Sequence, residues 1–343
     1  MKKIKTINAV GHILCHDVTQ IIKNLKAGPL FKKGHIVREE DIEKLLLAGK
    51  DHLYIYEIDK NLIHENEAAQ ILYELCASEK VTSTEVNEGK IEILANIDGL
   101  LKINTKQLQS VNELDDIIIA TLHQYTIVKK GDKIAGTRII PLMIAKTQLQ
   151  KAKKLVNGEP LLNILPLHIF KIGVIIIGNE IYYERIKDTF TPVIKKKLEE
   201  YNLKIDTRLV VKDDIEAIKS AIFKCKEQGM QLIICTAGMS VDPDDLTASA
   251  IKEAVPDIFY GIPALPGAML LIGYFKDETP ILGLPACVMY SSRSSFDLMF
   301  PRILAKDKIT KKELATLGHG GLCLKCLMCV FPNCRFGSSS SFA

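Results

Sequence analysis

Hydroxyl and small side chains follow an apolar run in the stretch LIICTAGMS, residues 232–240. Backbone N–H groups at a turn after a strand point into a cleft, and the small side chains of Ala237 and Gly238 let an anion approach them. Thr236 and Ser240 add hydroxyl donors to the same turn. This half of the motif therefore suits a bound phosphate.

Acidic residues follow immediately, because VDPDDLT carries Asp242, Asp244 and Asp245. These carboxylates would repel a bare phosphate, but they are compatible with one when Mg²⁺ lies between them, since Mg²⁺ takes one or two carboxylates together with phosphate oxygens. The alternative is that they cap the helix predicted from DDLTASAIKEAV. One aspartate suffices for a cap, so the three favour a Mg²⁺ site near Asp245 and Asp242.

The stretch PILGLPACVMYSSRSSFDLMFPRIL, residues 280–304, is a second candidate site. A strand ends before the tight turn at Gly283 and Pro285, and a helix follows. Ser291 and Arg293 lie at the expected mouth, where Arg293 could hold a phosphate through two N–H groups. A polar first turn of an ordinary helix explains the same residues equally well.

Four of the nine cysteines form a C-x2-C-x2-C-x4-C pattern near the C-terminus. The spacing is close to the bacterial ferredoxin run, although Pro332 precedes the last cysteine instead of following it. Zn²⁺ also accepts four thiolates, usually from paired C-x2-C motifs, and a segment without metal is the third alternative. The predicted ligands of an iron–sulfur cluster or Zn²⁺ are Cys323, Cys326, Cys329 and Cys334.

Histidines in the first segment offer a weaker metal hypothesis. His12 and His16 are four residues apart, which would place both on one face of a helix, and His35 lies further along. The local sequence is not clearly helical and has no obvious acidic third ligand, so the pattern does not favour a metal site.

The elements that carry the first candidate site alternate between strand and helix. Apolar runs of strand length start at Phe170, Lys204 and Gln231, and amphipathic segments separate them. Continuously apolar strands alternating with helices are typical of a parallel sheet covered on both faces. Such sheets bind ligands at the carboxyl ends of their strands. The loops expected there are Gly178, Asn179 and Glu180 after the first strand, and Thr236 to Asp245 after the third.

Residues 1–168 predict a separate α+β domain, and residues 310–343 a cysteine-rich tail with one short helix, so the α/β domain spans 169–309. In the first domain, turns are expected at Asp98-Gly99, Gly131-Asp132 and Gly136. Helices are expected at 37–50, 65–78 and 105–114, and strands at 52–58, 116–122, on both sides of Asp98-Gly99, and in 129–145.

The composition agrees with a cytoplasmic globular protein of two or three domains. The 343 residues carry a formal net charge of only +4, which gives no strong bias towards nucleic acid or a membrane. No uncharged apolar run is long enough to span a membrane, and His12, His16 and Asp17 interrupt any signal-peptide core. In a reducing compartment, clustered cysteines indicate metal or redox chemistry more often than disulfides.

Four segments in this order resemble a known family: IGNEI…RIKDTFTPVI, TAGMSVDPDDLT, YGIPALPGAML and PILGLPACVMYSS. They are similar to the molybdopterin-binding domain shared by molybdopterin adenylyltransferases and molybdenum insertases, including gephyrin, over residues 169–304. The resemblance implies a three-layer α/β domain that holds the pyranopterin and its phosphate at the strand ends.

The resemblance also implies roles for individual residues. The turn from Thr236 through Met239 to Ser240 would cradle the phosphate, and Asp245 matches an acid tied to Mg²⁺ and nucleotide chemistry. Asp188 matches the acid after the first strand, as a second catalytic candidate. The Gly-Leu-Pro turn of the family matches Gly283, Leu284 and Pro285.

Four positions depart from the family's pattern. Ile177 stands where a Thr is usual, and Glu184, Ala237 and Ala286 stand where Gly is usual. Each change adds bulk or removes a donor near the expected site, and Ala237 would be strained if its φ were positive.

Three functions remain open. The leading one is a transferase of molybdenum cofactor biosynthesis that acts on molybdopterin or its adenylated form with Mg²⁺, in adenylyl transfer from ATP or in molybdate insertion with release of AMP. The second is a non-catalytic cofactor carrier, an insertion chaperone that docks to a client molybdoenzyme and uses the cysteine cluster for structure or redox sensing. A weaker alternative is a nucleotide hydrolase on the same scaffold. The resemblance also implies a homo-oligomer.

Overall fold

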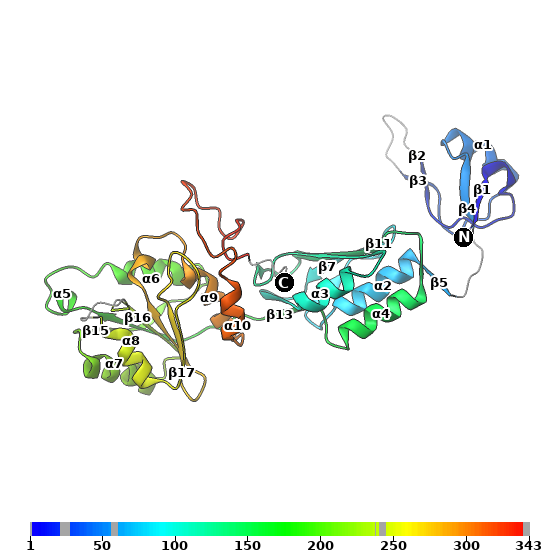
Figure 1. The fold of residues 1–343 in the computed structure, drawn as a ribbon. Coiled ribbons are helices and arrows are strands. Elements are labelled where there is room, and N and C mark those ends of the chain that lie inside the picture. The colour runs from blue at the N-terminus through cyan, green and yellow to red at the C-terminus, as the bar shows by residue number, and fades with distance from the viewer. Residues whose placement is uncertain (1, 21–27, 56–60, 237, 240–244, 339–343) are drawn as a thin grey trace. The chain divides into compact units, whose positions relative to one another are not determined.

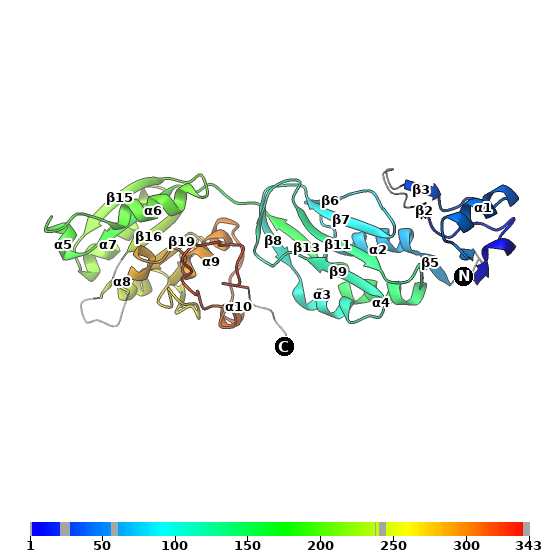
Figure 2. The same cartoon turned by 90° about the horizontal axis from the view of Figure 1, so that it is seen from above.

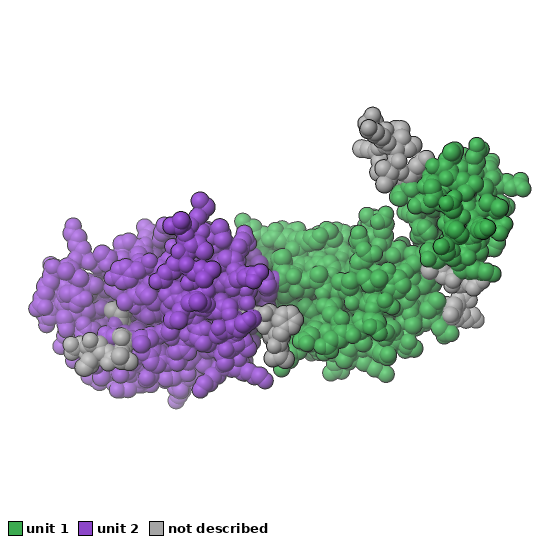
Figure 3. Space-filling model, turned by 45° about the horizontal axis from the view of Figure 1, so that its top comes forward, with its two compact units in different colours: residues 1–122, 128–164 green, residues 123–127, 165–343 purple. Residues whose placement is uncertain are grey.

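The protein was analysed as a computed structural model, which describes residues 2–20, 28–55, 61–236, 238–239 and 245–338. The chain folds into two compact units: residues 1–122 with 128–164, and residues 123–127 with 165–343 (Figure 3). Within the described residues, no helix is long and apolar enough to cross a membrane.

The amino-terminal part of the first unit is a small antiparallel assembly with its own core (Figure 1). Leu45 and Leu53 are among the buried residues of that core. The helix predicted at 37–50 is confirmed as α1, with three acidic residues in its first turn, where they stabilise the helix dipole. The elements are β1 (Lys2–Lys5) paired with β4 (His52–Ile55), β2 (Val18–Gln20) paired with β3 (Gly28–Phe31), η1 (Thr6–Asn8) and α1 (Glu39–Leu47).

The rest of the first unit is an α+β structure, as predicted, in which helices pack on small sheets (Figure 2). Its main sheet has the order β6-β7-β11-β9, and a three-stranded sheet has the order β10-β8-β13. The elements are β5 (Leu62–His64), α2 (Glu65–Cys76), β6 (Val81–Ser83), β7 (Lys90–Ala95), β8 (Gly99–Ile103), α3 (Thr105–Asn112), β9 (Ile117–Thr121), β10 (Ile127–Val128), β11 (Lys133–Ile139), β12 (Met143–Ala145), α4 (Lys146–Val156) and β13 (Leu162–Leu165).

Three details of this region differ from the sequence prediction. The turn expected at Gly136 is wrong, because Gly136 lies inside β11 and faces Glu92 on one side and Ala120 on the other. The strands β7 and β8 on the two sides of Asp98-Gly99 exist, but they join different sheets and do not pair with each other. The helix α4, which buries Leu149 on one face, was not predicted.

The second unit is built on a six-stranded sheet of order β15-β14-β16-β19-β18-β17. The first four strands are parallel, and β18 and β17 are antiparallel additions at one edge. The elements are β14 (Ile172–Ile177), α5 (Asn179–Tyr182), α6 (Phe190–Glu199), β15 (Ile205–Val211), α7 (Ile215–Glu227), β16 (Leu232–Thr236), α8 (Thr247–Ala254), β17 (Asp257–Tyr260), β18 (Leu271–Tyr274), β19 (Pro280–Leu284), η2 (Ala286–Met289), α9 (Ser295–Leu304) and α10 (Lys311–Thr316).

Helices cover both faces of this sheet, so the predicted three-layer arrangement is confirmed (Figure 1). Successive side chains of a strand point to opposite faces. Val174 and Ile176 of β14 pack in the core with α6 and α9, whereas Ile175 and Ile177 pack in the core with α7 and α8. Every residue of β14 is buried, which explains the continuously apolar sequence.

The cysteine-rich tail lies in the second unit and shares its core. Leu314 of α10, Leu317 and Phe336 are buried with α6 and α9. Backbone hydrogen bonds join the tail to an earlier loop, from the Leu265 N–H to the Gly321 carbonyl at 2.7 Å and from the Cys323 N–H to the Leu265 carbonyl at 2.8 Å. The main segment of the second unit begins at Leu165, and the predicted domain boundary at 168 stays a prediction.

Candidate functional site at the carboxyl ends of the parallel strands

The strands that precede the predicted ligand-binding loops end at one edge of the sheet. In the parallel register, Ile176 of β14 faces Thr236 of β16, and Thr236 faces Leu284 of β19. The carboxyl ends of these three strands, at Ile177, Thr236 and Leu284, therefore lie side by side. This edge is where an open parallel sheet binds its ligands.

The turn after β16 is packed against the turn after β19. Gly238 has a positive φ of 57°. The Met239 side chain is buried and lies against the Cα of Gly283, where a Cβ would overlap its sulfur. The Tyr260 hydroxyl donates a hydrogen bond to the Met239 carbonyl at 2.7 Å. Met239 and Gly283 thus position the two turns relative to each other, while the buried Thr236 hydroxyl lies 3.5 Å from the Ile175 carbonyl.

Thr247, the first residue of α8, is a site residue that the sequence analysis did not single out. Its side chain is fully buried against Gly238, and its Oγ1 has no hydrogen-bond partner among the described residues. The N-cap residue Leu246 makes no side-chain cap either. A buried hydroxyl without a partner costs about 1–3 kcal/mol, so this one is a candidate donor for a ligand oxygen. The only sequence signal is its place at the end of DDLT.

The proposed Mg²⁺ ligands are only partly described. Asp245 is half-buried just before α8. Asp242, together with Ala237 and Ser240 of the phosphate turn, lies outside the described residues. Across the described ranges, no group of three His, Cys, Asp or Glu residues is arranged to hold a metal ion. The Mg²⁺ site stays a prediction.

The loop after β14 is tied to the end of β15. The Asn179 N–H donates to the Asp213 carboxylate at 3.0 Å, and the Asp213 N–H donates to the Asn179 side-chain oxygen at 3.3 Å. Gly178 has a φ of 155°, and the exposed Glu180 side chain folds back over it. These bonds fix the loop at the ligand edge and leave its acidic side chain facing solvent.

Asp188 anchors the start of α6. Its carboxylate accepts hydrogen bonds from the N–H groups of Phe190 at 2.8 Å and Thr191 at 3.1 Å, and from the Thr191 hydroxyl. Arg208 forms an ion pair with it at 2.7 Å. Burial alone would raise the pKa of Asp188, but the hydrogen bonds from Thr191 and Arg208 outweigh it and lower that pKa. A catalytic role for this carboxylate stays a prediction.

Arg293 lies at the other end of α6. Its guanidinium pairs with Glu200 at 2.7 Å and with Asp297 at 3.1 Å, and it lies 5.0 Å from the centre of the Phe331 ring. Glu200 follows the last residue of α6, whereas Asp188 precedes its first, and a helix of this length spans about 15 Å. The structure therefore does not bring Arg293 to Asp188, and phosphate binding by Arg293 stays a prediction.

The four tail cysteines line one cavity of about 410 Å³. Cys326 and Cys329 are exposed, while Cys323 and Cys334 are half-buried. Ser291 and Arg293 line the same cavity, so these two predicted pterin ligands lie beside the thiols. The remaining lining is mostly apolar and comes from Tyr290, Leu322, Leu324, Val330, Phe331 and Phe336, with Ser292, Gly320, Lys325 and Arg335.

The amino-terminal histidines do not form the weak metal site considered from their spacing. The segment from His12 to His16 is not helical. The His35 Nε2 lies 2.7 Å from the Asp41 carboxylate, and the His12 ring lies 3.3 Å from the Val10 carbonyl. The His35 and His12 rings are thus engaged locally and apart from each other.

The fold and this edge define a parallel α/β ligand-binding domain. Residues 173–305, in the second unit, match a family described as a probable molybdopterin binding domain. Residues 3–57 match a domain of unknown function.

Individual relatives are more distant. A CinA-like protein from Amoebophilus asiaticus is 33% identical over 80 residues, 23% of this chain and 19% of that protein. A CinA-like protein from Citrifermentans bemidjiense is 33% identical over 84 residues, 24% of this chain and 20% of that protein. The matched segments thus span about a fifth of these curated relatives.

Solved structures that match part of the chain have low sequence identity to it. The molybdopterin biosynthesis enzyme MoaB from Thermus thermophilus is 20% identical with a TM-score of 0.36, covering 40% of this chain and 96% of that one. CinA from Thermoplasma acidophilum is 18% identical with a TM-score of 0.34, covering 39% of this chain and 98% of that one.

Proposed function

We propose that the second unit binds a pterin phosphate at the carboxyl ends of β14, β16 and β19, and that the protein acts in molybdenum cofactor biosynthesis in the cytoplasm. The family match over residues 173–305 supplies the ligand class. The observation that carries the placement is the buried, unpartnered Thr247 hydroxyl against Gly238, because a phosphate oxygen at this turn would accept its hydrogen bond.

Several residues at this edge would contact different parts of the ligand. Thr247 fills the space beside Gly238, so a phosphate at this turn would meet the Thr247 hydroxyl, with Thr236 at the end of β16. Ser240, which lies outside the described residues, would complete the cradle. Gly283, Leu284 and Pro285 form the neighbouring wall. Asp245 and Asp242 would hold Mg²⁺ beside the phosphate, and the ion would neutralise charge on it.

Pterin binding is tested by titrating the purified full chain anaerobically with molybdopterin. Thr247→Val keeps the shape and removes the hydroxyl, so we expect binding to weaken at least about tenfold. The matched control is Thr137→Val in the first unit, where another buried hydroxyl lacks a partner among the described residues. Equal binding by both variants, or no binding at micromolar pterin, would contradict the proposal.

The activity we propose is transfer chemistry on molybdopterin or its adenylated form. The protein is mixed with molybdopterin, ATP, Mg²⁺ and molybdate, and release of pyrophosphate and of AMP is followed. We expect turnover that Asp245→Asn abolishes without loss of pterin binding. Tight binding without turnover would establish the carrier alternative, which the engagement of Asp188 by Arg208 favours. Pterin-independent nucleotide cleavage would indicate the hydrolase.

We also propose that the four tail cysteines bind a metal as thiolates, either an iron–sulfur cluster or Zn²⁺. The supporting observation is that all four line one cavity in a single unit. Cluster binding predicts brown protein with iron and sulfide after anaerobic purification, whereas Zn²⁺ predicts colourless protein with about one zinc per chain. Cys326→Ser should lose the metal and Cys287→Ser, outside the motif, should keep it. Wild-type protein free of both metals would refute the proposal.

A further inference from the structure

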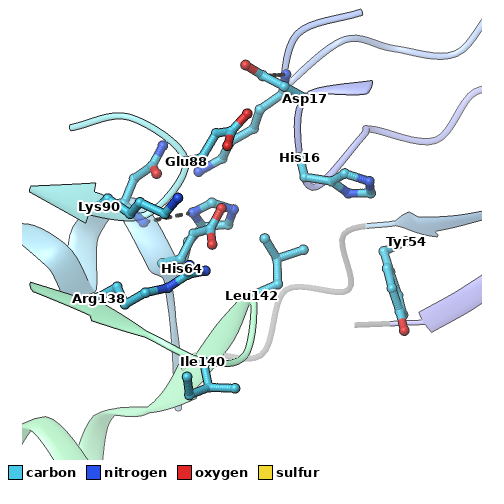
Figure 4. Close-up of a pocket in the computed structure, with 12 residues that line it drawn as sticks. His16, Asp17, Tyr54, His64, Glu88, Lys90, Arg138, Ile140 and Leu142 are labelled. Atoms are coloured by element: carbon cyan, nitrogen blue, oxygen red, sulfur yellow. Dashed lines mark hydrogen bonds between the residues drawn. The ribbon is translucent and has the colours of Figure 1, made fainter. Parts of the chain in front are cut away.

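A second pocket lies in the first unit, at the start of α2 (Figure 4). It is a cavity of about 430 Å³. The loop before β2 contributes His16 and Asp17, and the starts of α2 and β7 contribute Glu65 and Lys90. The complete lining is His16, Asp17, Lys33, Tyr54, His64, Glu65, Asn66, Glu88, Lys90, Arg138, Ile140 and Leu142.

The pocket gathers charged side chains of both signs without pairing them. Among the described residues, Lys33, Lys90, Glu65 and Glu88 make no side-chain hydrogen bond and no ion pair within 4.0 Å. The Arg138 side chain donates to the Ile139 carbonyl at 3.3 Å and pairs with no carboxylate there. Three cationic side chains and the carboxylates of Glu65 and Glu88 therefore face one cavity without ion pairs among the described residues, while the third acid, Asp17, accepts a hydrogen bond from the Lys33 N–H at 2.7 Å.

Burial disfavours the charged forms of two of these side chains. Burial lowers the pKa of Lys33, although Glu65 and other neighbours raise it. Burial raises the pKa of Glu65, although Arg138 and Lys33 lower it. Charges that are partly dehydrated and unpaired cost free energy, which a ligand of complementary charge would recover.

Two imidazoles complete the polar wall. The His64 Nδ1 accepts from the Asn66 N–H at 3.2 Å, so its Nε2 carries the proton and donates to the Cys15 carbonyl at 2.8 Å. This fixes His64 between the His16 loop and the start of α2. The His16 Nδ1 is buried and has no partner among the described residues. Burial lowers the pKa of both rings.

We propose that this pocket binds a small zwitterion with an apolar side chain, namely an amino acid or a short peptide. Equal numbers of cationic and acidic groups match a neutral ligand that carries one ammonium and one carboxylate. A simple anion such as phosphate would leave Glu65 and Glu88 unpaired. Tyr54 and Ile140 are 44% and 58% exposed at the pocket and, with Leu142, offer apolar contact to the ligand side chain.

The test is calorimetric titration of the full chain with four leucine probes and with inorganic phosphate. L-Leucine and L-leucyl-L-leucine distinguish the two sources of the zwitterion. N-acetyl-L-leucine lacks the ammonium and L-leucinamide lacks the carboxylate. We expect at least one zwitterion to bind, and each charge-deleted probe to bind at least about tenfold more weakly.

Substitutions of residues that line the pocket test whether the zwitterion binds there. Arg138→Gln and Glu65→Gln should each weaken zwitterion binding at least about tenfold. Lys133→Gln, on the same strand as Arg138, is the control because Lys133 forms an exposed ion pair with Glu92. Three results would overturn the proposal: no zwitterion binds, phosphate or a charge-deleted probe binds equally well, or the pocket variants bind like the control.

Discussion

Replacing Gly238 by alanine tests the packing of the candidate phosphate turn. A Cβ at this position would overlap the Thr247 hydroxyl and lie 3.1 Å from the Thr247 Cβ and 3.2 Å from its backbone nitrogen. Gly229, at the end of α7, supplies the matched control. Its φ of 73° is also left-handed, but a Cβ there would meet no atom within 4 Å.

Both substitutions place an alanine in left-handed backbone, but only Gly238→Ala also overpacks a buried side chain. Left-handed backbone costs an alanine about 1 kcal/mol, so we expect Gly229→Ala to destabilise the second unit by about that amount. Gly238→Ala adds overpacking against a buried side chain, which costs about 1–3 kcal/mol more. The double variant with Thr247→Ala removes the overlapping oxygen but keeps the Thr247 Cβ and backbone nitrogen, so in that background Gly238→Ala should cost less than in the wild type and still somewhat more than Gly229→Ala.

Hydrogen exchange with mass spectrometry is the suitable assay, because the chain has no tryptophan and its two units can unfold separately. Amides of β14 and β16 report on the second unit within the full chain. Each 1.4 kcal/mol accelerates their exchange about tenfold, so Gly238→Ala should exceed Gly229→Ala by about 5- to 150-fold. Equal exchange in the two variants would refute the described contact between Gly238 and Thr247.

Three further perturbations test the second unit. Asp297→Ala should lower the free energy of unfolding by about 3–5 kcal/mol in the same assay, because the Asp297 carboxylate pairs with Lys197 and Arg293. A loss below about 1 kcal/mol would contradict this expectation. Arg302→Met should lower the free energy of unfolding by a similar amount, because it removes the guanidinium that pairs with the buried Asp307 carboxylate at 2.6 Å. The double variant Arg302→Met with Asp307→Leu should regain most of that free energy. The hydrogen bond from Lys226 lowers the pKa of the exposed Asp277 to about 2. The small stabilisation of the folded state by this pair is therefore present above the ordinary pKa of 3.8 and is lost as the pH falls towards 2. An NMR titration of Asp277 with a midpoint near 3.8 in low salt would disprove the pairing.

The parallel sheet could be predicted because burial on both faces leaves a readable pattern. All six residues of β14 are apolar or glycine and all are buried. The ends of α7 were equally readable: the Asp214 side chain accepts from the Ala217 N–H at 2.8 Å, and Gly229 follows with a positive φ. Such caps depend on residues within a few positions, which a single sequence displays.

Glycine misled the prediction where pairing partners decide the structure. Gly136 suggested a turn, but β11 is flanked by β7 and β9 over its whole central part. A residue without a side chain is tolerated inside a central strand when both neighbours supply the hydrogen bonds. The sequence around Gly136 does not contain those neighbours, which come from segments about 15 and 45 residues away.

The position of Arg293 could not be predicted for a similar reason. Its neighbours in sequence are serines, which suggested a phosphate site, but its strongest partner is Glu200, 93 residues earlier. The Thr247 hydroxyl is the reverse case. Its sequence context predicts an ordinary first turn of a helix, and only the three-dimensional packing reveals that it lacks a partner.

Glu184 has a left-handed backbone conformation at a position where the family usually has glycine. The resemblance leads one to expect glycine at this position, and the structure places Glu184 at a φ of 55°, where glycine is least strained. A non-glycine residue there costs about 1 kcal/mol or more, so the surrounding contacts must hold the backbone in place. The Glu184 N–H donates to the Ile181 carbonyl at 3.1 Å, which closes the short helix α5 before it.

The cysteine tail and the strand-end site are physically connected within the second unit. The chain runs from Pro285 at the end of β19 to Tyr290 at the thiol cavity in only a few residues. The loop that hydrogen-bonds the tail at Leu265 also receives the start of α9, where the Ser295 hydroxyl donates to the Gly267 carbonyl at 2.6 Å. A metal bound by the thiols would therefore be held close to the segment that follows β19 and to the loop at Leu265, within the same unit as the proposed pterin site.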